Sequence, residues 1–600
     1  MDKHRAASEE AWSTFLRSRF ETCARARFKD FAVGRADLAD LELAVMEGRV
    51  IYARQQRNKV MGACRLPPEI LSKVFTHAQE DWSPALQGKD RIFDNGQDRV
   101  IRARYSSGWM NLLHVCSSWR QTALGSPSLW CNISCMDVHP DSVPTLLARS
   151  RGLPLSLSIN GASLSFNDGD DLQAQLSWLW LSKPALRRTR RLVLDNVPDH
   201  RLHQWLRNLL HPMPLLETFK VNNSRRERPD ITATLPADLF ACNAPVLRSV
   251  SLSQTILPSD WGCVLFSHNL VDLSLGFDAS SPRDVVLASA PTSQSFYRSI
   301  LSMKALRSLT LRNIFPALPQ GEHPPIEANV KLPNLKDLTL ASVTSELVGR
   351  CLDFFHRLII PAQTRVILEV VAEDDFNFDD RLPIHIVKLF AHSEATTPST
   401  MYLSQHAIST TYTSPSPQAI LRTQIPREPA YTWAEYNLGA GARGLLIRQW
   451  ATVLPHFQLL PLQSLQTMVF TSDFSDAEEL LTPEGWTHTM AFAQNVRNIS
   501  VHYFDALVLL DALCEPGTEP SIPFLLFPRL LTIALHATEY VKHPDETYVE
   551  MGASLEVLLL DMLRVRQERG APVATLLVSE RFAGWDVWGR VEELAHVEFF

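Results

Sequence analysis

A six-residue phrase with apolar residues at its first, fourth and sixth positions recurs along the middle of the chain. It reads LETFKV from Leu216, LRSVSL from Leu247, LVDLSL from Leu270, LRSLTL from Leu306 and LKDLTL from Leu335. Apolar and polar residues alternate at the end of each phrase, as they do in a half-buried β-strand. Each phrase therefore predicts one strand.

The spacing of these phrases indicates a repeat architecture. Their first leucines, Leu216, Leu247, Leu270, Leu306 and Leu335, are 31, 23, 36 and 29 residues apart, which fits one strand and one returning helix or loop per repeat. Further candidate strands lie at Leu192–Leu194, Val366–Leu368, Leu465–Phe470, Val496–Val501, Leu530–Leu535 and Val573–Val578. The pattern resembles degenerate leucine-rich repeats, so we expect an irregular α/β solenoid over residues 136–600.

Two features make this array irregular. Leucine-rich repeats use a regular asparagine to bond the backbone at the turn, whereas Ser224, Thr255 and Val343 stand at that place here. Residues 374–460 contain no good phrase, which leaves two interpretations: degenerate repeats that continue, or a loop-rich insertion. Met401-Tyr402-Leu403 is a candidate strand and favours the first interpretation.

The first 60 residues predict an N-terminal helical segment. Over residues 38–60, Leu41, Val45 and Ile51 lie near one helical stripe among charged neighbours. The stripe covers too few heptads to require a coiled coil. We interpret it as a single exposed packing helix.

Residues 61–135 predict a small helical module. Pro67 and Pro68 suit the start of a helix, because the missing N–H of proline is not needed in the first turn. Ile70, Leu71, Val74 and Phe75 then form one apolar stripe. The polar segment from Gln79 to Ser107 reads as a long loop, and a second helix is predicted over Met110–Leu124, with Leu112, Cys116, Trp119 and Ala123 along one face.

Three ordered phrases in this module resemble the F-box family. They are LPPEILSKVF from Leu66, LHVCSSWR from Leu113 and PSLW from Pro127. The resemblance is closest to F-box-like proteins of mushroom-forming fungi, which place a long loop between the two helices and irregular leucine-rich repeats after them. It implies an α+β architecture: a helical F-box module followed by a leucine-rich-repeat-like α/β solenoid.

The resemblance also implies a function. In this family the module binds a Skp-type adaptor, which links to a cullin scaffold, and the repeats present a client protein for ubiquitin transfer. The chain would then be a non-catalytic substrate-recognition subunit of a ubiquitin ligase. A repeat scaffold that binds Skp without an active ligase remains the main alternative, and an enzyme built on the repeats is a third.

Adaptor binding is assigned to the apolar residues of the module. A module this small buries little apolar surface, so its bulky residues cannot all be internal, and a partner helix should cover some of them. The predicted adaptor-binding residues are Leu66, Pro67, Ile70, Leu71, Val74, Phe75, Val115, Cys116, Trp119, Leu129 and Trp130. The client should meet exposed strand positions of the repeats, among them Arg248, Ser251, Asp272, Ser274, Arg307, Thr310, Lys336 and Thr339.

Composition sets further limits. The formal net charge is -7, so no general attraction to nucleic acid or to an anionic membrane is predicted. No apolar run is long enough for a membrane helix and no secretory signal is visible, so an intracellular protein, in cytoplasm or nucleus, is expected. The Cys count of 9 on such a chain predicts free, buried thiols rather than a disulfide framework.

Rival chemistry is poorly supported. Residues 439–444, GAGARG, match a dinucleotide fingerprint in spelling, but the preceding residues are not an apolar strand; we interpret them as a turn before a helix starting at Leu445. Cys131, Cys135 and His139 lack the second ligand pair of a structural zinc site. We therefore predict no catalytic residues, no metal and no cofactor.

Overall fold

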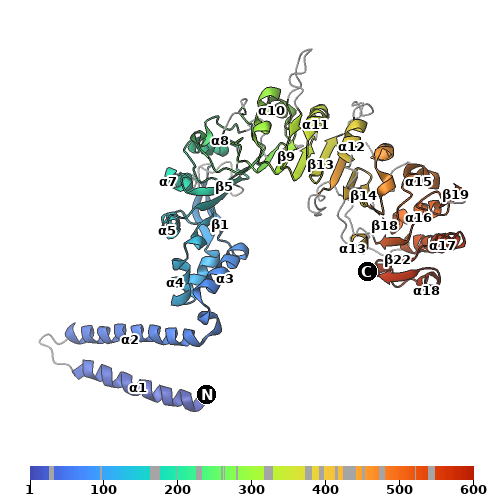
Figure 1. The fold of residues 1–600 in the computed structure, drawn as a ribbon. Helices are drawn as coiled ribbons and strands as arrows, with labels where there is room; N and C mark the ends of the chain where they lie inside the picture. Colours follow the sequence, from blue (N-terminus) through green and yellow to red (C-terminus); the bar gives the residue numbers. More distant parts are fainter. Residues whose placement is uncertain are drawn as a thin grey trace. The chain divides into compact units, whose positions relative to one another are not determined.

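A computed structural model (Figure 1) describes residues 1–600 except 26–32, 95–96, 162–175, 177, 198, 224–232, 259–260, 262–263, 279–280, 317–328, 343, 372–381, 391–397, 412–416, 423–440, 449–452, 472–473, 475–479, 520–521 and 538–546. The chain forms two compact units, residues 1–159 with 167–180, and residues 160–166 with 181–600. It is a mixed α/β protein with a long, mostly parallel sheet, which counts seventeen strands in the described residues.

The first unit begins with two long helices, α1 (Asp2–Arg25) and α2 (Val33–Val60). Helix α2 contains the predicted helix over residues 38–60 and extends it at its start. It contacts α1 through an ion pair between Arg19 and Glu42. The interpretation of a single packing helix is therefore wrong, because the polar residues of α2 that looked solvated include a partner for α1.

The helical module follows. It comprises η1 (Gly62–Arg65), α3 (Pro68–Asp81), η2 (Gly108–His114), α4 (Ser117–Gly125) and η3 (Pro127–Trp130), of which the η elements are 3-10 helices. Helix α3 starts at the predicted prolines. The single helix predicted over Met110–Leu124 is wrong: Cys116 is extended (φ -159°, ψ 169°) and its Sγ accepts a hydrogen bond from the Trp119 N–H at 3.5 Å, which begins α4 afresh.

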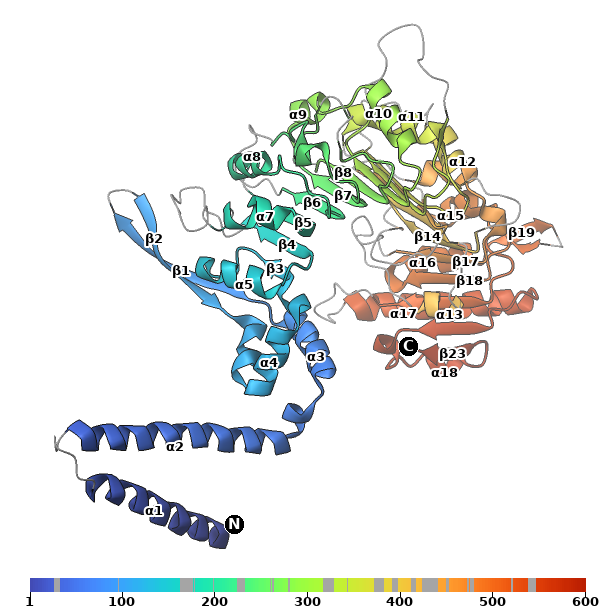
Figure 2. The same cartoon turned by 60° about the vertical axis from the view of Figure 1, so that its left-hand side comes forward.

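A β-hairpin stands where a loop was predicted. Strands β1 (Ala85–Asp94) and β2 (Gln97–Ser106) pair antiparallel, with Asp94 opposite Gln97 (Figure 2). The signal was Asn95-Gly96, typical of a tight hairpin turn, between two short apolar pairs; these two residues themselves lie outside the described ones. The unit continues with β3 (Asn132–Ser134), η4 (Pro140–Ser142), α5 (Val143–Arg149) and β4 (Leu155–Asn160), and β3 and β4 are parallel.

In the second unit every recurring phrase forms a strand, as predicted. The strands are β5 (Thr189–Asp195), β6 (Thr218–Asn222), β7 (Ser249–Ser253), β8 (Asp272–Gly276), β9 (Ser308–Arg312), β11 (Asp337–Ala341) and β13 (Arg365–Val371), all parallel and in register. We call β6, β7, β8, β9 and β11 the early strands. In each of them the leucine-type residues are buried and the alternate residues mostly half-buried, so one face of the sheet forms the core.

The connections of these repeats are short helices and a small strand pair. They comprise α7 (Lys183–Leu186), α8 (Asp199–Asn208), η6 (Leu239–Cys242), α9 (Arg283–Ala288), α10 (Ser293–Ser302), β10 (Val330–Lys331), α11 (Ser345–Arg357) and β12 (Leu358–Ile359). Strands β10 and β12 pair in parallel. Figure 1 shows α10, α11 and α12 (Leu382–Phe390) along one face of the sheet.

Buried amides occur one residue before the place where the repeat asparagine was sought. Asn223, Gln254 and Asn313 are buried, and the Asn313 Nδ2 donates to the Phe277 carbonyl oxygen at 3.0 Å. Gln254 (φ 58°) and Asn313 (φ 55°) are left-handed, a conformation that asparagine tolerates better than most residues. The same place holds Phe277 and Ser342 in two other repeats, so the array has an asparagine there in some repeats only and not as a regular feature; Ser224 and Val343 themselves lie outside the described residues.

Residues 374–460 continue the sheet without continuing the repeat. Strands β14 (Thr400–Ser404), β15 (Ala407–Thr411) and β16 (Arg443–Arg448) enter in the order β13-β16-β15-β14-β17, with β15 antiparallel to both neighbours. Met401–Leu403 is a strand, as predicted. The helix expected from Leu445 is wrong, because Leu445 and Ile447 alternate in a buried strand; Gly439 and Ala440 lie outside the described residues.

The sheet ends in parallel strands that we call the late strands. They are β17 (Thr467–Phe470), β18 (Asn498–His502), β21 (Thr532–His536), β22 (Thr575–Val578) and β23 (His596–Phe599), of which the first four were predicted. Around them lie α13 (Pro417–Leu421), η8 (Leu454–Leu459), η9 (Leu462–Ser464), α15 (Pro483–Met490), α16 (Tyr503–Ala512), the hairpin β19 (Pro516–Glu519) and β20 (Ile522–Phe524), α17 (Thr547–Glu568), η12 (Glu580–Phe582) and α18 (Trp588–Val591).

Candidate functional site

An apolar stripe is exposed on one side of α3. Ile70 and Val74 are four residues apart and lie one above the other along α3, 44% and 42% exposed. Leu66, which stands just before the helix in extended conformation, is 37% exposed. We call these three residues the α3 stripe. Pro67 beside them is exposed, and Val115, directly before the cap of α4, is 51% exposed. Five predicted adaptor-binding residues therefore have free surface.

The adjoining side of α3 is internal. Leu71 and Phe75 are completely buried, and Leu129 and Trp130 are almost so. The Phe75 ring packs against Trp119 with centroids 5.4 Å apart, and the Trp130 Nε1 donates to the Ala123 carbonyl oxygen at 2.8 Å. These four predicted residues have no surface for a partner. Their packing holds α3 against α4 and η3, and so positions the α3 stripe.

Trp119 and Cys116 lie at the boundary between core and surface. Both are partly buried, and the Trp119 Nε1 donates to the Ala63 carbonyl oxygen at 3.3 Å, which connects α4 to η1. Cys64 of η1 lies beside the Cys116 thiol. Desolvation and that neighbouring thiol raise the pKa of Cys64. This corner therefore joins η1, α3 and α4 through one indole and two free thiols.

A small cavity lies beneath the module. Its volume is about 60 Å³, and its lining includes Gln79, Trp109, Trp130 and Asn132. The Gln79 Nε2 donates to the Leu129 carbonyl oxygen at 2.6 Å. Pockets for organic ligands are usually ~300–1,000 Å³, so this cavity is too small for a substrate or an organic cofactor.

The second unit presents a continuous row of side chains on the face of the sheet opposite its helices. Strand register links Lys220, Ser251, Ser274, Thr310 and Thr339 across the early strands, and Tyr402, Val469, Ser500, Ala534, Leu577 and Glu598 across β14 and the late strands. We call this the inner row. It contains four of the positions expected to meet a client.

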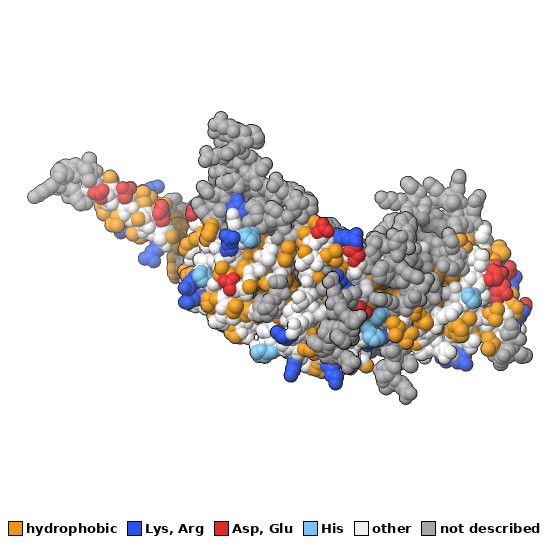
Figure 3. Space-filling view, turned by 90° about the horizontal axis from the view of Figure 1, so that it is seen from above, with side chains coloured by type: hydrophobic (Ala, Val, Ile, Leu, Met, Phe, Trp, Pro, Cys, Tyr) orange, Lys and Arg blue, Asp and Glu red, His pale blue; other side chains and the backbone are white. Residues whose placement is uncertain are grey.

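The early half of the inner face is polar and carries both charge signs. Asp337 and Arg365 form an ion pair at 2.9 Å, and Arg312 pairs with Glu369 at 3.3 Å. Partial burial raises the pKa of Asp272, against the attraction of nearby cations. Acidic and basic side chains are also interspersed on the face of the molecule drawn in Figure 3, which agrees with the small net charge of -7.

The remaining positions expected to meet a client lie beside this row. Arg248, Arg307 and Lys336 each directly precede a strand and are exposed, and Asp272 is the exposed first residue of β8. The sequence predicted that all of these side chains are exposed, but it did not predict to which face of the sheet each one points. The strand register of the structure gives that information.

The late half of the inner row is buried and mostly apolar between Tyr402 and Glu598. Val469, Ser500, Ala534 and Leu577 are at most 1% exposed, whereas the early members of the same row are half-buried. Because the helix side of these strands is also buried, both faces of β17, β18, β21 and β22 are covered. The repeat phrases did not predict this difference, since they specify only which residues face the helices.

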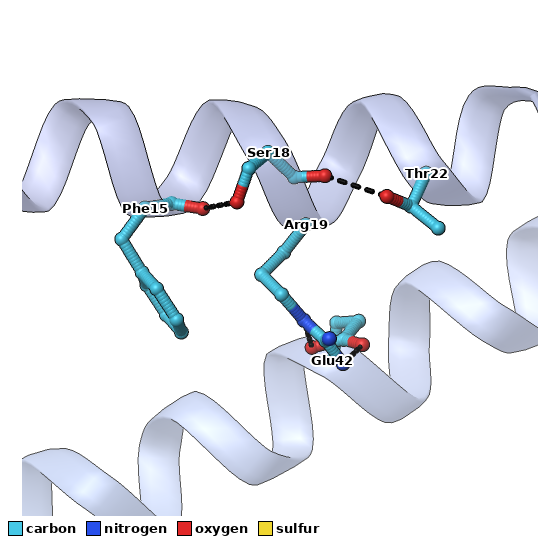
Figure 4. A network of polar contacts seen from close by, with 5 residues as sticks. All are labelled: Phe15, Ser18, Arg19, Thr22 and Glu42. Carbon is cyan, nitrogen blue, oxygen red and sulfur yellow. Dashed lines mark hydrogen bonds and ion pairs between the residues drawn. The ribbon is translucent and has the colours of Figure 1, made fainter.

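A further apolar surface lies on the N-terminal helices. Trp12 and Phe15 of α1 form an edge-to-face pair with centroids 6.1 Å apart and are exposed. Figure 4 shows the Arg19–Glu42 pair that joins α1 to α2, and two hydroxyls, of Ser18 and Thr22, that donate to α1 carbonyl oxygens. No described residue shows what covers the exposed aromatic pair.

Comparison with known proteins adds no information on these surfaces, because no protein-family model and no curated protein matches the chain. Among the described residues, no group of three or more His, Cys, Asp and Glu side chains is placed to hold a metal ion. No helix in the described part of the chain is both long and apolar enough to span a membrane.

Proposed function

We propose that the protein is the substrate-recognition subunit of a Skp, cullin and F-box ubiquitin ligase. The observation that carries the proposal is the α3 stripe, which stands within the ordered phrases that resemble the F-box family. In this proposal the α3 stripe and Val115 bind the adaptor, the inner face of the repeats binds the client, and the chain itself catalyses nothing.

The energetics of the α3 stripe support an adaptor-binding role. A helix of a soluble protein normally turns its apolar side inward, and contiguous exposed apolar patches mark interaction surfaces. Helix α3 has two apolar sides, Leu71 and Phe75 facing the core and Ile70 and Val74 facing outward. A partner helix that lies along Ile70 and Val74 would remove this surface from water, within an interface of roughly 800 Å² per partner.

The two surfaces suit two kinds of contact. The α3 stripe is apolar, which fits a lasting contact with one adaptor. The early inner row consists of Lys220 and four hydroxyl side chains, Ser251, Ser274, Thr310 and Thr339. Such a face selects a partner by hydrogen bonds and charge, which give specificity more than affinity.

Adaptor capture by the full-length chain tests the proposal. Ile70→Asp with Val74→Asp places two carboxylates on the exposed side of α3. We expect recovery of purified Skp-type adaptor to fall at least about tenfold, since each aspartate would be desolvated without a partner in the interface. The urea unfolding midpoint should stay unchanged, because neither side chain is internal.

The matched control is Lys73→Asp with Thr76→Asp, two exposed positions on another side of α3. This variant should recover the adaptor like the unsubstituted chain. Undiminished recovery by the Ile70 and Val74 variant would contradict the proposal. When purified cullin is added to the captured complex, its retention supports an active ligase, whereas an adaptor complex that does not retain cullin would favour the scaffold alternative. Leu71→Ala is a poor test, since loss of a buried leucine costs about 2–5 kcal/mol of stability by itself.

A further inference from the structure

A short helix of the chain lies on the inner face of the late strands. The Phe470 ring of β17 packs against Trp486 of α15, with centroids 5.4 Å apart, so Phe470 faces the helix side of the sheet. Val469 must then face the other side, and its core contact there is Ile420 of α13. Figure 1 likewise places α13 on the face opposite α15 and α16.

Helix α13 follows the inner row across successive strands. Ile420 packs with Val469 of β17 and with Tyr402 of β14. Leu421, the next residue, packs with Ala534 of β21 and Leu577 of β22. The contacts of α13 therefore fall on four apolar or aromatic members of the inner row, on either side of Ser500.

Polar contacts also bind α13 and the residue after it to the sheet. The Leu421 carbonyl oxygen, at the end of α13, accepts a hydrogen bond from His536 Nε2 at 2.6 Å, and the His536 side chain is buried. Arg422, which follows, forms an ion pair with Glu598, the last member of the inner row. The two apolar side chains, the Leu421 carbonyl oxygen and the Arg422 guanidinium thus each contact a residue of the sheet.

The other side of α13 faces solvent. Gln418 and Ala419 are exposed, whereas Ile420 and Leu421 are at most 3% exposed. The segment follows the antiparallel hairpin of β14 and β15 and precedes β16 in the chain, so it belongs to the part of the sheet where the repeat order is broken. It is an addition to the repeats, and the helix side of the late strands packs without it.

We propose that the inner face of the late strands is a peptide-binding surface that α13 occupies in cis, and that a client segment of the same chemistry competes with α13 for it. The client segment is a short helix with two adjacent apolar residues followed directly by arginine or lysine. The apolar pair covers Val469, Ala534 and Leu577, and the basic residue meets Glu598. Identifying the competitor as a client rests on the proposed function; the binding surface does not.

A labelled peptide tests this directly with the full-length chain. The probe is a fluorescein-labelled synthetic peptide of residues 414–425, and the readout is fluorescence anisotropy. In Ile420→Asp with Leu421→Asp, the chain's own segment can no longer cover the apolar row. We expect this variant to bind the probe at least about tenfold more tightly than the unsubstituted chain, because the surface is then free in cis.

The matched control is Gln418→Asp with Ala419→Asp, which adds the same charges to the exposed side of α13. It should bind the probe like the unsubstituted chain. A probe with aspartate in place of its Ile-Leu pair should bind none of the proteins. Equal probe affinity for all three proteins, or equal affinity for both probes, would overturn the proposal.

A second pair of variants keeps the test decisive if the aspartates unfold the late strands. The Arg422 and Glu598 side chains are 37% and 40% exposed and lie at the edge of the apolar contacts, so their replacement leaves the core intact. With Arg422→Glu in the chain, the arginine-containing probe should bind more tightly than to the unsubstituted protein. With Arg422→Glu and Glu598→Arg together it should bind more weakly, because the chain's own ion pair is restored with reversed charges while the arginine of the probe meets a like charge. The same probe affinity in both variants would contradict the proposed binding surface. Adaptor capture is independent of these results, so failure of one proposal is distinguishable from failure of the other.

Discussion

The two halves of the inner row differ although they share one sheet and one register. Across the early strands the row is polar and half-buried, and across β17, β18, β21 and β22 it is buried and mostly apolar. The backbone pairing is parallel in both halves. Strand geometry alone therefore does not decide whether a repeat face is open. The residue at the central inner position decides it, together with a segment of chain that can cover that residue.

The largest expected effect comes from placing a carboxylate in each half of the same row. Leu577→Asp should lower the free energy of unfolding by about 4 kcal/mol or more, because an unpaired charge would be buried between the sheet and α13. Thr310→Asp, at the matching position of β9, should change it by less than about 1 kcal/mol. Urea denaturation followed by circular dichroism measures both, and equal losses would remove the distinction between the halves.

Substitution of Arg566 tests which interactions stabilise the helix side of the late strands. It is fully buried on α17 and donates to the carbonyl oxygens of Leu513 at 3.0 Å and Phe527 at 2.6 Å, with its guanidinium 4.4 Å from the Phe524 ring centre. Arg566→Met should cost about 3 kcal/mol in the same urea experiment, since two buried acceptors lose their donors.

The control for this substitution is Arg564→Met, at an exposed position of α17. It should cost less than about 0.5 kcal/mol. If Arg566→Met were as mild as Arg564→Met, the helix side of the late strands would depend on apolar packing alone.

The late strands should also make stability depend on pH. Burial lowers the pKa of His502 to about 4, helped by the adjacent His536. Between pH 6.5 and 4 the unfolded chain binds a proton that the folded chain does not, so stability falls as pH falls, by roughly 3 kcal/mol in all. Above pH 6.5 this effect is absent. The early inner row has no such buried histidine among its described members.

Replacing the histidine should flatten this dependence. His502→Phe keeps a ring and removes the titration, so the loss of stability between pH 7 and pH 4.5 should become smaller. His488→Gln, on the exposed surface of α15, serves as the control and should leave the slope as it is. An unchanged slope in His502→Phe would show that this side chain is not the cause.

The smallest effect concerns the open half. Asp337→Asn removes the ion pair with Arg365. Both side chains of this pair are solvent-accessible. Exposed pairs contribute about 0–1 kcal/mol and are screened by salt. The loss should therefore stay below about 1 kcal/mol and shrink further in 0.5 M NaCl. A larger, salt-independent loss would mean that the early face is also covered.

The strands of the array were predictable because their signal is local. Alternation within Leu306–Leu311 or Leu335–Leu340 is enough to specify a strand and the side that faces the core. The hairpin of β1 and β2 was missed because its strands are rich in charged residues, which favoured a loop over the Asn95-Gly96 signal. The strand at Leu445 was misassigned for the opposite reason, since a short apolar run does not distinguish helix from strand.

The candidate site was only half predictable. The phrase around Ile70 and Leu71 predicts an apolar helix, but both of its sides are apolar, and only packing against Trp119 and η3 decides which side is free. Helix α13 was beyond local inference, because Arg422 and Glu598 are 176 residues apart in the chain. Contacts at that separation have no periodic signature in the sequence.

The difference between the two halves is tested most directly by thiol labelling of a matched pair. Ser274→Cys and Ser500→Cys are near-isosteric and place a thiol in the same inner row, in an early and in a late strand. Native Cys242 is exposed and gives an internal reference rate. With a maleimide reagent and peptide mapping, we predict that Cys at position 274 reacts within about tenfold of the reference. Cys at position 500 should react at least about a hundredfold more slowly, and faster once Ile420→Asp with Leu421→Asp is added. Equal rates at the two positions would contradict the division of the inner face into an open and an occupied half.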